Sequence, residues 1–141
     1  MRFLSAWLPF LLLEATVIFI SSRPGSSIHL PFARVDKVLH FGEYAALGFL
    51  LYRALRMSGG RRREAVVSTL ALIAALGLGD EAFQSRIPGR DSSIYDWFAD
   101  LIGGSTGVAF GARIERLMPW LFSFKTEGAE PTTNPRVESE G

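Results

Sequence analysis

The sequence contains no cysteine, which excludes a disulfide framework, a zinc ribbon and a cysteine nucleophile. It also has no excess of charge of either sign, because 15 basic and 14 acidic residues leave a formal net charge of +1. A nucleic-acid-binding domain usually carries a large basic excess, so we expect no nucleic-acid partner. Only 21% of the 141 residues are charged and 48% are apolar, a composition that argues against a disordered or collagen-like chain.

Polar residues are also scarce within four long stretches of the chain. These apolar blocks cover residues 3–20, 38–52, 65–83 and 94–112. Between Leu8 and Ile20 the only charged residue is Glu14, and residues 65–79 offer only Ser68 and Thr69 as polar side chains. A soluble helix shows a polar stripe with a period of about 3.6 residues, whereas a bilayer about 30 Å thick accepts apolar helices of about 20 residues.

The blocks therefore predict an all-α fold, a four-helix transmembrane bundle in residues 1–124, with spans at about 3–20, 38–57, 64–84 and 94–113. A soluble four-helix bundle is the alternative, but a bundle this small has no interior that could bury four such helices. The first block could instead be a cleaved signal peptide; the charge of Glu14 and the length of the apolar run favour a retained helix. Residues 125–141, rich in Glu, Thr, Pro and Gly, predict a disordered cytoplasmic tail.

The distribution of arginine predicts how the bundle is oriented. Short loops that are rich in Lys and Arg stay in the cytoplasm. Five arginines surround the turn between the second and third blocks: Arg53, Arg56, Arg61, Arg62 and Arg63. This turn and both termini are therefore expected in the cytoplasm, and segments 21–37 and 84–95 on the outside, in a multi-pass protein of the cell (inner) membrane.

The ionisable residues of the last three blocks share one predicted depth. Measured along each helix from a cytoplasmic arginine, with a rise of about 1.5 Å per residue, they lie about 20 to 26 Å away: His40, Asp80, Asp96 and Asp100. That depth is the outer third of a hydrocarbon layer about 30 Å thick, where a charged side chain costs several kcal/mol unless it faces partners inside the bundle. We therefore expect these side chains to converge in a polar chamber that is open to the outside.

Helical spacing assigns further side chains to this chamber, because residues one or two turns apart lie on the same helix face. The sets are Asp36, His40 and either Glu43 or Tyr44 on the second helix, Asp80 and Gln84 with Glu81 beside them on the third, and Asp96 and Asp100 on the fourth. The helix face that carries Asp96 and Asp100 continues with Gly103, Gly107 and Gly111. This GxxxGxxxG pattern predicts close packing against another helix.

Several of these residues also have a purely structural interpretation. Ser93 and Asp96 fit a capping box, so Asp96 could simply begin the fourth helix, as Asp36 could begin the second. Tyr44 could pack in the core of the bundle. The arginines at positions 61–63 are expected to set the topology only.

Five short motifs occur in order between about Ile18 and Gly111. They are Ser21-Ser22-Arg23-Pro24, Asp36-Lys37-x-x-His40-Phe41-x-x-Tyr44, Asp80-Glu81-x-x-Gln84, Pro88-Gly89-Arg90 and Asp96-x-x-Ala99-Asp100-x-x-Gly103. Together these motifs resemble the VanZ-like family of small bacterial membrane proteins. The family often has Asn in place of Asp100 and Gln in place of Arg23, and an acid at position 100 favours a bound cation or a shared proton.

The resemblance implies a polytopic protein of the bacterial cell envelope. The family is named for an accessory factor in low-level resistance to the glycopeptide teicoplanin. The family name does not identify a reaction, so the resemblance leaves open whether this chain is an enzyme.

Two classes of function fit the predicted chamber. In the first, the chamber binds or transforms a lipid-linked envelope substrate. The acid, base or metal-ligand roles then fall to His40, Asp80, Glu81 and Asp100, and substrate binding to Asp36, Lys37, Tyr44, Gln84, Arg90 and Asp96. Mixed histidine and carboxylate ligation suits Zn, Mn or Mg, but no spacing motif in the sequence fixes a metal or another cofactor.

In the second class the protein is a non-catalytic scaffold or binding protein, held together by buried ion pairs of Asp36 or Glu81 with Lys37 or Arg90. A transporter is a weaker third interpretation, because four short spans would have to form an oligomer. The expected partners are the lipid bilayer and either a lipid-linked substrate or a glycopeptide.

Overall fold

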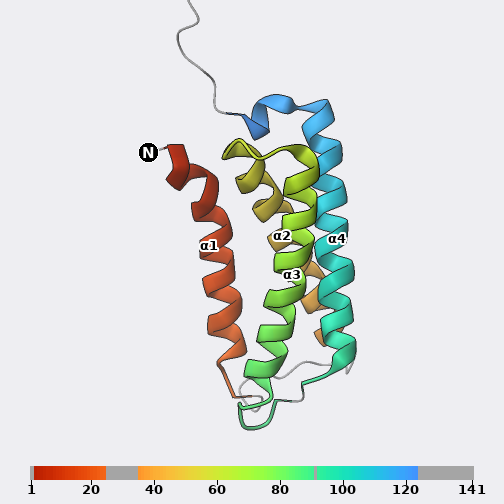
Figure 1. Cartoon of the computed structure of the whole chain (residues 1–141). Helices are drawn as coiled ribbons and strands as arrows, with labels where there is room; N and C mark the ends of the chain where they lie inside the picture. The colour runs from red at the N-terminus through yellow and green to blue at the C-terminus, as the bar shows by residue number, and fades with distance from the viewer. Residues whose placement is uncertain (1, 25–34, 91, 124–141) are drawn as a thin grey trace, which may run out of the picture.

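The computed structural model of the chain describes residues 2–24, 35–90 and 92–123. In these ranges the chain forms four α-helices, one short 3-10 helix and no strand: α1 (Arg2–Ser21), α2 (Val35–Met57), α3 (Arg62–Gln84), α4 (Ile94–Leu117) and η2 (Pro119–Phe122) (Figure 1). The predicted all-α fold with four helices is therefore confirmed. The predicted tail, residues 125–141, lies outside the described residues.

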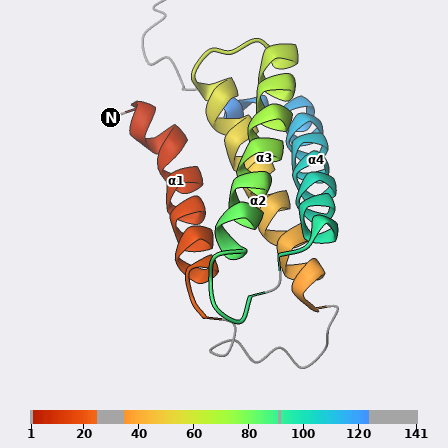
Figure 2. The same cartoon turned by 60° about the horizontal axis from the view of Figure 1, so that its bottom comes forward.

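The helices pack side by side as an up-and-down bundle, in which α1 and α3 run one way and α2 and α4 the other (Figures 1 and 2). We call the end where α2 and α4 begin the acidic end, because it carries Asp36, Asp80, Glu81, Asp96 and Asp100. We call the opposite end, where α2 and α4 end, the basic end, because it carries the arginines at positions 53, 56, 61–63, 113 and 116.

The buried apolar side chains form two clusters. One joins α2, α3, α4 and η2 through Tyr52, Ala65, Val108 and Phe122. The other cluster lies between α1, α2 and α3. It contains the buried side chains of Phe10 and Val17 from α1, Tyr44, Leu47 and Leu51 from α2, and Ile73 from α3. α1 packs mainly on α2, touches α3 and makes no contact with α4 in the described part of the chain. It therefore stands at the edge of the bundle, as Figure 1 shows.

Local sequence signals explain where α3 and α4 begin and how the chain turns before α3. At the N-cap of α4, the Ser93 hydroxyl accepts a hydrogen bond from the Tyr95 N–H at 3.2 Å. At the start of α3, the Arg61 N–H donates to the Glu64 carboxylate at 3.2 Å. The turn before α3 contains Gly59 with φ +90°, a left-handed conformation that glycine adopts without steric cost.

The closest packing in the bundle is between α2 and α4, where glycine lets the two backbones meet. A Cβ atom added to Gly103 would collide with the carbonyl oxygen of Phe41, and one added to Gly107 would collide with that of Ala45. The contact also uses Gly48 and Gly104, which lie against each other and which the GxxxGxxxG pattern did not identify. Small residues therefore set the distance between these two helices.

Large apolar side chains cover much of the outside of the bundle. Exposed examples occur on all four helices: Phe3, Leu8, Leu12 and Phe19 on α1, Val38 on α2, Val67 and Leu78 on α3, and Ile102 and Phe110 on α4. Two helices are long and apolar enough to cross a membrane: α1 over Phe3–Ser21 and α3 over Arg62–Gln84. Only 17% and 22% of their most apolar windows are buried inside the bundle, so neither is a buried core helix.

α2 and α4 were also predicted to be spans, but among the described helices only α1 and α3 meet this criterion. The reason is chemical, because α2 and α4 carry ionisable residues such as Lys37, His40, Asp96 and Asp100.

Replacing Gly107 by Ala should force α2 and α4 apart, because the new methyl group has no space next to the Ala45 carbonyl and the Phe49 N–H. We expect a loss of about 1 to 3 kcal/mol in the free energy of unfolding, measured by denaturation of the purified protein. The control is Gly42→Ala on the exposed side of α2, where an added Cβ atom meets nothing within 4 Å. Equal stability of the two variants would contradict the close contact.

Candidate functional site

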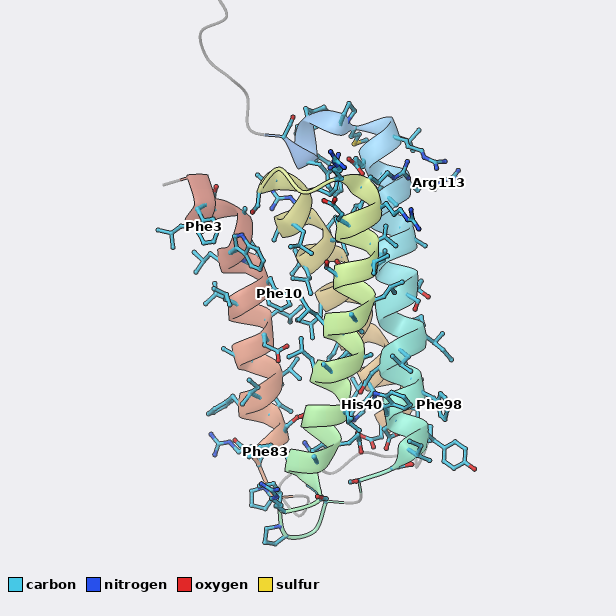
Figure 3. The ribbon with its side chains drawn as sticks, in the orientation of Figure 1. Phe3, Phe10, His40, Phe83, Phe98 and Arg113 are labelled. Carbon is cyan, nitrogen blue, oxygen red and sulfur yellow. The ribbon has the colours of Figure 1, made fainter. Side chains whose placement is uncertain are left out.

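The candidate site lies at the acidic end, where residues from α2, α3 and α4 converge inside the bundle. His40 is 5% exposed, Glu81 7%, Asp96 3% and Asp100 0%. In Figure 3, His40 lies near the same end as Phe83 and Phe98, and far from Phe3 and Arg113 at the basic end. Ionisable side chains this deeply buried need partners, so their contacts decide what the site can do.

The central contact joins α2 to α4 through a histidine and an aspartate. His40 Nδ1 and Asp100 Oδ1 are 2.9 Å apart, within hydrogen-bond distance, and both side chains are buried. The second carboxylate oxygen of Asp100, Oδ2, is buried without a hydrogen-bond partner among the described residues. It faces α3 at Gly77, where an added Cβ atom would lie 2.9 Å from Oδ2.

A second contact between the same helices is an ion pair. Lys37 Nζ lies 2.5 Å from Asp96 Oδ1, with the lysine side chain 44% exposed and the aspartate almost fully buried. The scaffold interpretation of the sequence offered Asp36 or Glu81 as an example of a partner for Lys37, whereas the structure pairs Lys37 with Asp96. One helical turn separates Asp96 from Asp100 on the face toward α2, so Asp96 is the acid that meets the lysine.

Glu81 of α3 holds the start of α4. Its Oε2 atom accepts a hydrogen bond from the Ser93 backbone N–H at 2.8 Å. In the predicted capping box this N–H would have been bonded by Asp96, but Asp96 pairs with Lys37 instead. The other oxygen of Glu81, Oε1, is buried and has no hydrogen-bond partner in the described part of the chain.

A neighbouring group of polar side chains links α3 to α1. Gln84 donates hydrogen bonds from Nε2 to Asp80 Oδ2 at 3.0 Å and to Ser21 Oγ at 3.2 Å. Arg90, in the connection after α3, donates to the Ile20 carbonyl oxygen at 3.2 Å, and its buried Nε atom has no partner among the described residues. The pairing of Arg90 with an acid, also predicted as a possible structural contact, is therefore not present in those residues.

Two pockets adjoin these groups. The smaller, of about 40 Å³, reaches His40 and is called the end pocket; it is lined by Ile20, Ser21, Asp36, Leu39, His40, Glu43, Gln84 and Arg90. The larger, of about 300 Å³, lies between α1, α2 and α3 and is called the lateral pocket; it is lined by Glu14, Val17, Ile18, Tyr44, Ala75, Leu76, Gly79, Asp80 and Phe83. The hydrogen bond between Asp80 and Gln84 connects the walls of the two pockets.

The predicted site residues are thus divided between two places. His40, Glu81, Asp96 and Asp100 gather with Lys37 and Asp36 where α2, α3 and α4 meet, whereas Tyr44 and Asp80 line the lateral pocket. The sequence left Glu43 and Tyr44 as alternatives on α2, and each lines one of the two pockets. The sequence placed Ser21 in a motif but not in the site. Its contact with Gln84 depends on how α1 packs against α3, which residue spacing within one helix does not show.

The basic end has a polar network of a different kind. Glu115 of α4 accepts a hydrogen bond from the Tyr52 hydroxyl on one carboxylate oxygen, and Arg56 lies 2.5 Å from the other. Arg62 adds a hydrogen bond of 2.9 Å to the Ala112 carbonyl oxygen. Arg62 was expected to set the topology only, and this was incomplete, because it also joins α3 to α4.

The two ends therefore differ in how their carboxylates are satisfied. Both oxygens of Glu115 have donors, as in a structural network, whereas Glu81 and Asp100 each leave one buried oxygen without a partner in the part of the chain that the structure describes. Native proteins rarely leave buried polar atoms without partners, so such atoms are candidates for ligand contacts. The pair His40 and Asp100 can share a proton, and the same residues with Glu81 can hold a cation.

Comparison with known proteins gives a family. The model of the family described as VanZ/LLP1 matches residues 4–115, a range that includes almost all of α1 to α4. No curated protein and no solved structure matches the chain.

The His40–Asp100 contact should appear as a coupling free energy between the two side chains. In a double-mutant cycle of His40→Ala and Asp100→Ala, we expect a coupling of about 0.5 to 3 kcal/mol, measured as the free energy of unfolding. The control cycle combines His40→Ala with Thr106→Ala, an exposed residue of α4 whose hydroxyl bonds within its own helix. The same coupling in both cycles would argue against a direct contact between His40 and Asp100.

Proposed function

The chain belongs to the VanZ/LLP1 family, and from this premise we propose that it is an integral membrane protein of the bacterial cell envelope. We propose that its acidic end faces the outside of the membrane and binds the polar head group of a lipid-linked envelope component. The single observation that carries this proposal is the buried His40–Asp100 pair. It lies beside carboxylate oxygens that have no partner among the described residues, and His40 lines the end pocket.

The outer surface of the bundle supports the location in a membrane. Exposed large apolar side chains on all four helices would be costly in water, and hydrocarbon is the solvent that accepts them. The arginines of the basic end fit the cytoplasmic side, because basic segments are retained there. This orientation puts both termini in the cytoplasm and the acidic end outside.

The two pockets support a lipid-linked ligand. The lateral pocket is mostly apolar and suits a hydrocarbon chain, and its polar lining residues are Glu14, Tyr44 and Asp80. The end pocket presents polar groups, including His40, Glu43 and Arg90. Because the Asp80–Gln84 hydrogen bond joins their walls, one ligand can place its chain in the first and its head group near the second.

The chemistry available at the acidic end without a bound ion is proton transfer and hydrogen bonding. In that state His40 can act as a base whose ring is oriented by Asp100, as histidine often is by a carboxylate. Arg90 offers an Nε–H that has no partner among the described residues, a donor that suits a phosphate or carboxylate oxygen of a head group. Lys37 is less available for this role, since it is already paired with Asp96.

A second candidate function is a non-catalytic scaffold whose polar network holds the helices together. The observation that favours it is that Lys37–Asp96 and Glu81–Ser93 join separate helices in the manner of structural contacts. Buried pairs of this kind can fix the register of packed helices without taking part in a reaction.

Profiling of membrane lipids and cell-wall precursors separates the two candidates. Cells that lack the protein, or that make the His40→Ala or Asp80→Asn variant, should accumulate or lose the same lipid-linked species. The matched control is Tyr52→Phe, which removes a buried polar contact at the other end of α2 and should give the wild-type profile. The susceptibility of the same cells to teicoplanin tests the proposed link to glycopeptide resistance.

The amount of membrane-inserted protein must be measured in parallel. Normal insertion of His40→Ala with a changed profile supports a site. A wild-type profile from the inserted variant, or loss of the inserted protein itself, supports the scaffold and contradicts the proposal.

A further inference from the structure

Three buried side chains of the acidic end have the arrangement of a metal site. His40 of α2, Glu81 of α3 and Asp100 of α4 each offer one ligand atom, and these atoms all lie within 4.8 Å of one another. Each side chain comes from a different helix, so the arrangement is produced by the packing of the bundle. Histidine nitrogen and carboxylate oxygen are both ligands that divalent transition metals accept.

The charge balance of this group calls for a cation. Two carboxylates are buried here, and in the described part of the chain no lysine or arginine forms an ion pair with either of them. The only ion-pair partner of Asp100 there is His40, and the polar contact of Glu81 is a backbone N–H. Buried charges in proteins are paired or coordinate metals.

Two unpartnered atoms give an independent indication of a missing ligand. Glu81 Oε1 and Asp100 Oδ2 are buried and have no hydrogen-bond donor among the described residues, although the other oxygen of each carboxylate is held by a fixed contact. For Glu81, whose other oxygen is held by the Ser93 N–H outside the group, this is the pattern of a metal ligand that an outer contact orients. For Asp100 the other oxygen contacts His40, a member of the same group, so Oδ2 is the oxygen left for an ion. The carboxylate of Glu115 at the basic end has both oxygens engaged and lacks this feature.

A second group of similar geometry is a poorer candidate. Asp36, His40 and Asp96 also have ligand atoms within 4.8 Å of one another, but Asp96 is already neutralised by Lys37 at 2.5 Å. An ion can reach His40 through the end pocket of about 40 Å³. That volume exceeds the roughly 10 to 15 Å³ needed by a single water molecule.

We propose that His40, Glu81 and Asp100 bind one divalent transition-metal ion, Zn²⁺ or Mn²⁺, at the acidic end. The histidine nitrogen favours these ions over Mg²⁺, which prefers a shell of oxygen ligands and water. The inference goes beyond the proposed function, since the ion can be measured without knowing any substrate. A bound divalent cation would also make the acidic end more favourable for an anionic head group.

The experiment uses the untagged full chain purified in detergent and treated with a chelator. Zn²⁺, Mn²⁺ and Mg²⁺ are titrated separately, and uptake is measured by calorimetry and by metal analysis after removal of free ion. We expect the wild type to bind about one Zn²⁺ or Mn²⁺ ion per chain, and the melting temperature to rise with the ion.

Two variants on different helices and one matched control locate the site. Glu81→Gln and Asp100→Asn should each weaken binding by about tenfold or more and abolish the rise in melting temperature. Glu64→Gln makes the same chemical change as Glu81→Gln at the exposed opposite end of α3, and should bind as the wild type does.

The proposal is overturned if the chelator-treated wild type takes up neither Zn²⁺ nor Mn²⁺, or if Glu81→Gln and Asp100→Asn bind the ion as tightly as Glu64→Gln. Should either variant fail to fold, the titration of the wild type and of the other variant still decides. These readouts are independent of lipid profiling, so a failure of metal binding is distinguishable from a failure of the proposed function.

Discussion

The close approach of the α2 and α4 backbones is the constraint on which the acidic end depends. Gly103 and Gly107 admit the carbonyl oxygens of Phe41 and Ala45, and a side chain at either glycine would separate the helices. Asp100 lies less than one turn before Gly103, and His40 directly precedes Phe41, so the same contact places the imidazole against the carboxylate. A hydrogen bond between short buried side chains needs this proximity, because neither can extend to cover a wider gap.

The bundle carries polar contacts of opposite character at its two ends. At the basic end, Tyr52 and Arg56 supply donors to both oxygens of Glu115, and the network is complete. At the acidic end, Glu81 and Asp100 are each held by one oxygen and leave the other buried without a donor among the described residues. An incomplete buried network costs stability, so a bundle that needed only cohesion would have no use for it. Because of this difference, we propose ligand binding at the acidic end and cohesion at the basic end.

The sequence predicted the helical fold more readily than the contacts of the candidate site. Runs of apolar residues indicate helices directly, and a rise per residue is enough to place His40 and Asp100 at one level. The partner of each side chain depends also on the rotation of each helix about its axis. Residue spacing within one helix does not determine this rotation. For that reason the ion pair of Lys37 with Asp96 was missed, as was the bond from the Ser93 N–H to Glu81. Gly48 was not identified because it has no glycine four residues before or after it on α2. Only the fold shows that it meets Gly104.

The acidic end is proposed to face the outside of a membrane, and the absence of cysteine from the sequence allows a direct test of this orientation. A single cysteine is introduced either as Ser92→Cys, exposed at the acidic end, or as Ser58→Cys, exposed at the basic end. Intact cells are then treated with a membrane-impermeant thiol reagent. The account predicts labelling of Ser92→Cys in intact cells, and of Ser58→Cys only after the membrane is permeabilised. Labelling of Ser58→Cys but not Ser92→Cys in intact cells, or labelling of neither before permeabilisation, would contradict it.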